Sequence, residues 1–157
     1  MPPPVDIAAL EVLVTAFERV ELTPATFHHR EHLLVALTLM SRHPPDEAVE
    51  RMRTGLAAIL ARSGHPDAYH ETVTQCWMRV LRHRMSTLDP RRPLADRLAD
   101  VLAWSQDARP LEAHYSPDCL ATAEARRTFV PPDRAPLPDV AFEPAAASAP
   151  RCDQPVR

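Results

Sequence analysis

The sequence contains no lysine, so arginine supplies every basic side chain, and the acidic residues outnumber the basic ones. The formal net charge is −3, and the arginines are scattered along the chain rather than gathered into one stripe. A nucleic-acid-binding surface needs a concentrated positive field. We therefore expect no nucleic-acid partner.

Long hydrophobic runs are also missing. The longest predominantly apolar run extends from Leu33 to Met40, which is far too short to cross a bilayer. The N-terminus does not combine a basic region, an apolar stretch and a cleavage site in the manner of an export signal. These absences predict a cytoplasmic protein with no membrane partner.

Cysteine is scarce, and its three positions are far apart. Cys76, Cys119 and Cys152 include no C-x-x-C pair, so neither a disulfide framework nor a thiolate zinc site is indicated. A reducing cytosol fits this pattern best.

Glycine and β-branched runs are nearly absent, which excludes a sheet-rich fold. Only two glycines occur, whereas alanine, leucine, arginine and glutamate recur at helical spacing. The prolines fall between the periodic segments or at their first turns, where a missing N–H costs little. The pattern predicts helices over about residues 6–20, 23–41, 45–63, 68–85 and 93–106, followed by short helical turns capped by Ser116 and Thr122.

This arrangement predicts an all-α fold: an up-and-down bundle of four to five helices, followed by short C-terminal helices. We assign residues 1–129 to the bundle domain. Residues 130–157 are rich in proline and lack periodicity, which predicts a disordered or loosely docked tail.

Histidines concentrate near the predicted starts of the second and fourth helices. In an up-and-down bundle these two helices run parallel, so their N-termini share one end. At about 100° per residue, His29 and His32 lie beside the buried face of the second helix, and His70 lies beside the core face of the fourth. We therefore expect these three imidazoles to meet inside the protein.

Three converging imidazoles match the ligand set of an open metal site, and iron or zinc is the divalent ion that we expect. Glu71 is placed to act as a fourth metal ligand, as a hydrogen-bond acceptor for the N–H of a ligating imidazole, or as a general base. Tyr69 is the other catalytic candidate, although its spacing from Trp77 also suits core packing. The favoured hypothesis is a small metal-dependent enzyme whose substrate is a small molecule.

Two other hypotheses stay open. One is a non-catalytic module that binds or senses a metal or an anionic small molecule and acts through a protein partner. The other is a structural protein whose histidines bond to one another. Arg79, Arg82 and Arg84 are interpreted as a solvated face, and the sequence does not determine the oligomeric state.

Several segments resemble those of a set of small bacterial proteins. That set carries an FxHxxHL segment, here 27–33, and a YHET segment, here 69–72. A Tyr-Ser-x-x-x-Leu stretch beginning at Tyr115 precedes an Arg-x-x-Phe-Val-x-Pro-Asp stretch over 126–133. The resemblance implies which residues to follow, and implies docking of the segment 126–133 on the bundle.

Overall fold

The computed structural model describes residues 1–138, and all regular secondary structure in that range is helical. The α-helices are α1 (Ile7–Glu18), α2 (His29–Arg42), α3 (Pro45–Arg62), α4 (Glu71–Ser86), α5 (Leu94–Asp107), α6 (Pro110–His114), α7 (Pro117–Leu120) and α8 (Ala123–Arg127). A single 3₁₀ turn, η1 (Pro66–Ala68), precedes α4. The predicted all-α fold is confirmed.

The predicted caps form where the sequence places them. The carboxylate of Asp6 accepts hydrogen bonds from the backbone N–H groups of the second and third residues of α1. The hydroxyl groups of Ser116 and Thr122 cap α7 and α8 in the same way. Each cap satisfies N–H groups that the first turn of a helix leaves without an intrahelical acceptor.

The start of α2 differs from the prediction. Thr23 and Pro24 do not open the helix, because Thr26 closes a separate turn by donating its N–H to the carbonyl of Thr23 at 2.9 Å. The helix begins at His29, and the Glu31 carboxylate accepts the N–H of the preceding residue, His28. His29 is thus the first helical residue instead of lying inside the second turn.

The start of α4 is also later than predicted. His70 is the cap rather than a residue of the first turn, and its Nδ1 accepts the N–H of Val73 at 3.2 Å. The loop before it contains the 3₁₀ turn η1.

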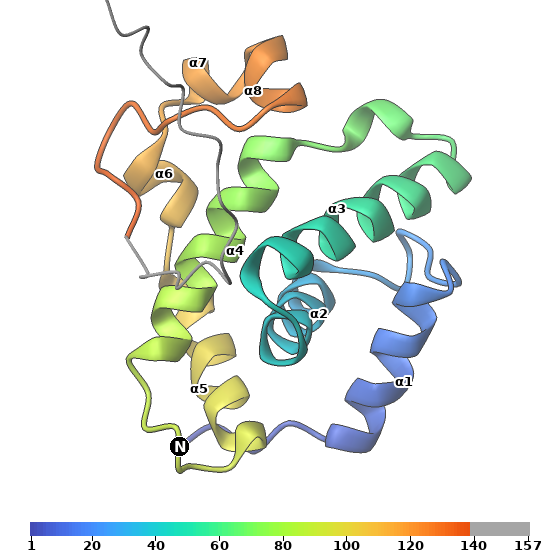
Figure 1. Cartoon of the computed structure of the whole chain (residues 1–157), viewed down its shortest axis with the longest axis vertical. Helices are drawn as coiled ribbons and strands as arrows, with labels where there is room; N and C mark the ends of the chain where they lie inside the picture. Colours follow the sequence, from blue (N-terminus) through green and yellow to red (C-terminus); the bar gives the residue numbers. More distant parts are fainter. Residues whose placement is uncertain (139–157) are drawn as a thin grey trace, which may run out of the picture.

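Helix α2 lies at the centre of the bundle and contacts α1, α3, α4 and α5. Every residue from Leu33 to Leu39 is buried, since neighbours cover this helix on all sides. Figure 1 shows α2 nearly end-on, whereas α4 lies across the view. The two helices therefore cross instead of running parallel, which alters the expected histidine cluster.

The C-terminal segment packs against α4. The hydroxyl of Thr72 donates to the carbonyl of Thr128 at 2.9 Å and accepts the N–H of Val130 at 3.2 Å. The hydroxyl of Tyr115 donates to the carbonyl of Val130 at 2.7 Å. Leu137 packs on the apolar cluster that contains Tyr115.

Residues 130–138 of the predicted tail are thus held on the bundle. The remaining part of that tail, 139–157, lies outside the described residues. Among the described helices, none combines the length and the apolarity that a bilayer span requires.

Gly55 allows α1 and α3 to approach closely. A Cβ atom at this position would lie 2.2 Å from Cζ of Phe17, whose side chain is only 1% exposed. The aromatic ring is enclosed by the core and has little room to move. Glycine is therefore required here for packing, despite its low helix propensity.

We predict that Gly55→Ala destabilises the protein by about 1–3 kcal/mol, because the ring of Phe17 must shift within a packed core. In an uncrowded helix the same change would stabilise by about 1 kcal/mol. Urea unfolding measures the difference. In a Phe17→Leu background the penalty should shrink, and an equal penalty in both backgrounds would contradict the steric explanation.

We also predict that Thr72→Val lowers the free energy of unfolding by about 1–3 kcal/mol, because the N–H of Val130 loses its acceptor. Thermal and urea unfolding provide the measurement. Thr54→Val serves as the matched control, since the Thr54 side chain is exposed and makes only a long contact with Glu50. Equal losses in the two variants would show that Thr72 does not hold the C-terminal segment.

Candidate functional site

Both ring nitrogens of His70 are engaged by backbone groups. Nδ1 accepts the N–H of Val73, and Nε2 lies 2.8 Å from the carbonyl oxygen of Leu120. This pair of contacts requires the neutral tautomer with its proton on Nε2. His70 therefore caps α4 and anchors α7, and neither nitrogen keeps a lone pair for another ligand.

His29 and His32 lie together beside α4, in a pocket that His70 does not line. The His29 ring meets the edge of the Trp77 ring at a centroid distance of 4.8 Å. Val73 and Thr74 line the same pocket, so the two histidines of α2 face the first two turns of α4.

The His32 ring stacks on Phe27 at a centroid distance of 4.0 Å, and its Nε2 donates to the carbonyl of Phe27 at 3.2 Å. Burial lowers the pKa of His32, with a smaller opposing effect of this hydrogen bond. His32 is therefore neutral at physiological pH.

These positions do not fit the expected metal centre. Within residues 1–138, no group of three or more histidine, cysteine, aspartate or glutamate side chains is close enough to hold an ion. His29 and His32 share one pocket, whereas His70 is separate from them and bonded through both nitrogens. The three residues that the sequence groups together thus have distinct environments.

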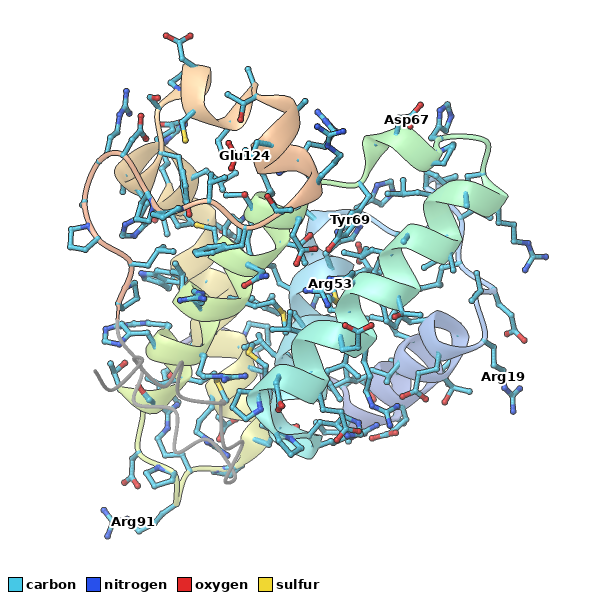
Figure 2. All side chains as sticks on the ribbon, turned by 45° about the horizontal axis from the view of Figure 1, so that its top comes forward. Arg19, Arg53, Asp67, Tyr69, Arg91 and Glu124 are labelled. Carbon is cyan, nitrogen blue, oxygen red and sulfur yellow. The ribbon has the colours of Figure 1, made fainter. Side chains whose placement is uncertain are left out.

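Glu71 and Tyr69, the two catalytic candidates, do meet. The Tyr69 hydroxyl donates to Oε2 of Glu71 at 2.5 Å, and the Gln75 amide donates to Oε1 at 2.8 Å. From α3, Nε of Arg53 lies 3.1 Å and 3.0 Å from the two carboxylate oxygens. Figure 2 shows Tyr69 and Arg53 next to one another between α3 and α4.

This network determines the charge of Glu71. Burial alone would raise the pKa of Glu71, but hydrogen bonds from Arg53, Tyr69 and Gln75 outweigh it and lower the pKa to about 2. Burial and the contact with Glu71 raise the pKa of Tyr69 above its usual value. At neutral pH the carboxylate is ionised and the phenol is protonated. A carboxylate so weakly basic, with all these donors on it, is poorly suited to take a proton from a substrate.

Arg53 is missing from the sequence-based candidates, although a signal for it exists. It lies four residues after Val49 and three before Leu56, and therefore borders the apolar stripe of α3. A charged residue at the margin of such a stripe indicates a partner on the adjacent element. The partner is Glu71, which is only 5% exposed.

A groove of about 490 Å³ runs between α3 and α4 beside this network. We call it the α3–α4 groove and define it by Asp46, Glu50 and Arg53 of α3 together with Met78, Arg79 and Arg82 of α4. Its residues recur at intervals of three and four on both helices, so that each helix supplies one continuous wall. The volume lies within the range of small-molecule binding sites.

Arg79 and Arg82 are half-buried in this wall, whereas the sequence analysis interpreted them as part of a solvated face. The Arg79 guanidinium lies 4.4 Å from the centroid of the Phe129 ring and makes no hydrogen bond to any residue in 1–138. Burial, and then the nearby charge of Arg79, lower the pKa of Arg82. The α4 wall thus brings two partly desolvated cations together.

Comparison of the chain with protein-family models, curated proteins and solved structures found no match. The functional argument therefore rests on geometry. The segments that resemble those of the small bacterial proteins contribute mainly to docking: Thr72 and Tyr115 hold the C-terminal segment, and Arg126 donates to the carbonyl of Asp67 at 3.0 Å. Asp133 likewise accepts the N–H of Ser116 at 2.8 Å.

We predict that Glu71→Gln lowers the free energy of unfolding by about 2 kcal/mol or more near pH 7, since the partly buried Arg53 loses its carboxylate. Because the folded-state pKa of Glu71 is depressed, its contribution is complete above the usual 4.5 and is lost as the pH falls toward about 2. The difference between wild type and variant should therefore shrink over this window in urea unfolding. Glu112→Gln, which removes an exposed ion pair with Arg109, should show little difference at any pH.

Proposed function

We propose that the protein is a non-catalytic binding module for a small organic monocarboxylate, which occupies the α3–α4 groove. Its carboxylate would bind to Arg79. The observation that carries the proposal is the Arg79 guanidinium, which lines a ligand-sized groove and has no hydrogen-bond acceptor in residues 1–138. A non-catalytic module for an anionic small molecule was one of the two alternatives that the sequence left open. The binding site proposed here lies at Arg79 and not at the histidines.

The charges of the groove favour a single negative charge. Arg53 is already held by Glu71 and by Glu50, so it contributes little free positive potential. Asp46 adds a further carboxylate to the α3 wall, whereas Arg79 of α4 has no hydrogen-bond acceptor within residues 1–138. One carboxylate can pair with the Arg79 guanidinium, whereas a second negative charge on the ligand would be repelled by the carboxylates of the α3 wall.

The groove also accommodates an apolar body next to that charge. Val49 and Pro45 contribute apolar surface from α3, and the buried Met78 contributes it from α4. An apolar surface with a few placed polar groups is typical of small-molecule sites. The ligand class is thus an amphipathic acid, with its carboxylate on α4 and its hydrocarbon part along both helices.

The arrangement of the acid and base candidates supports binding over catalysis. Tyr69 and Arg53 both bond to Glu71, and the shifted pKa values of Glu71 and Tyr69 keep each in one protonation state near neutrality. Arginine does not exchange protons in this range either. The groove therefore offers charge and shape, without a group poised for proton transfer.

The test is a titration of the full chain with 4-phenylbutyrate and, separately, with 4-phenylbutanol. Calorimetry measures the affinity, and NMR shift mapping locates the binding site. The acid should bind about tenfold more tightly than the alcohol, as expected for hydrogen bonds to charged groups. Arg79→Gln should weaken the binding of the acid by about tenfold. Raising the salt concentration from about 0.05 M to about 0.5 M should lower the affinity for the acid and leave the affinity for the alcohol unchanged.

Arg91→Gln is the matched control, because within residues 1–138 Arg91 pairs only with Asp89, on an exposed loop. Figure 2 shows it pointing into solvent away from the Tyr69–Arg53 network. Equal affinity for acid and alcohol, or acid binding that is unchanged by Arg79→Gln, would contradict the proposal. Loss of binding in the control variant as well would indicate a nonspecific charge effect.

A further inference from the structure

A second, smaller pocket lies between α2, α3 and α4, with a volume of about 130 Å³. We call it the histidine pocket and define it by His29, His32, Ala36, Leu56, Thr74 and Trp77. Only Met78 lines both this pocket and the α3–α4 groove. The histidine pocket is thus separate from the site of the proposed function.

The size and walls of the histidine pocket suit one ring. An apolar cavity of about 150 Å³ in another protein accommodates benzene. Leu33, Leu56 and Leu81 give this pocket its apolar walls, and the Trp77 ring adds an aromatic one. The occupant is therefore limited to a single small ring with a short substituent.

The histidines add a specific polar requirement. The Nε2–H of His32 is used by the carbonyl of Phe27, so in the neutral ring Nδ1 is left as an acceptor. That nitrogen has no hydrogen-bond partner among residues 1–138, and the ring is fixed by stacking on Phe27. An acceptor held in one orientation beside an apolar cavity favours a ligand that donates a hydrogen bond.

We propose that the histidine pocket binds a small neutral aromatic molecule that carries one O–H or N–H donor, with Nδ1 of His32 as its acceptor. The ring packs among the leucine side chains and against Trp77. His29, which is exposed, lines the pocket and meets the indole edge-on. A charged ligand is excluded, because the pocket supplies no counter-ion for it.

Fluorescence of Trp77 provides the test, in a Trp104→Phe background that leaves Trp77 as the single indole. The probes are phenol, toluene of nearly equal size without a donor, and benzoate with a charge. Phenol should change the emission in a saturable way and bind about fivefold more tightly than toluene, as expected for one hydrogen bond. Benzoate is tested in an added Arg79→Gln background, so that the α3–α4 groove does not bind it, and should leave the Trp77 signal unchanged.

Two variants separate the hydrogen bond from the cavity. His32→Leu removes the acceptor, so phenol should bind no better than toluene. Ala36→Leu fills the pocket, and both probes should lose their effect on Trp77. His28→Leu is the matched control, since this neighbouring histidine does not line the pocket.

Thermal unfolding with each probe keeps the test decisive for a destabilised variant, because a bound probe raises the melting temperature. Equal affinity for phenol and toluene in the wild type, or phenol binding unchanged by both pocket variants, overturns the proposal. Binding of Zn²⁺ alone that is lost in both His29→Ala and His32→Ala also overturns it, since the imidazoles would then serve as metal ligands. None of these results depends on the α3–α4 groove.

Discussion

The ion pair between Arg53 and Glu71 is the constraint on which the rest of the candidate site depends. It joins α3 to α4 at a carboxylate that is almost fully buried and that also accepts hydrogen bonds from Tyr69 and Gln75. A buried charge is tolerated only when it is paired and hydrogen-bonded. The network therefore joins the two walls of the groove at a fixed spacing. It also keeps Glu71 ionised and Tyr69 protonated, so neither exchanges a proton near neutral pH.

Periodicity and capping were sufficient to predict most of the helices. Asp6, Ser116 and Thr122 cap the helices that the sequence assigned to them, since a short polar side chain at a helix start has a local effect. The start of α2 was wrong because Thr23-Pro24 is compatible both with a first helical turn and with an isolated turn. The hydrogen bonds between Thr23 and Thr26 form the isolated turn, and the spacing of Thr23 and Pro24 alone does not indicate these bonds.

The site was less predictable, because it depends on how helices cross. The spacing of His29 and His32 predicted that they share one helix face, and both line the same pocket. The contact between Tyr69 and Glu71 was not predicted. The sequence could not give the angle between α2 and α4, which results from ridge-and-groove packing of side chains on both helices. His70 does not line the pocket that the other two histidines share, and both of its ring nitrogens are bonded to backbone groups.

The aromatic ring of Phe129 covers the guanidinium of Arg79, and Phe129 belongs to the segment that Thr72 and Tyr115 hold against α4. A ligand that binds the Arg79 guanidinium competes with the ring of Phe129, and so acts on a contact that helps to hold the C-terminal segment on α4. Thermodynamic reciprocity then requires that docking of the segment changes the ligand affinity by the same factor as ligand binding changes the docking equilibrium. The segment that contains Phe129 is therefore coupled to the occupancy of the groove through the side chain of Arg79.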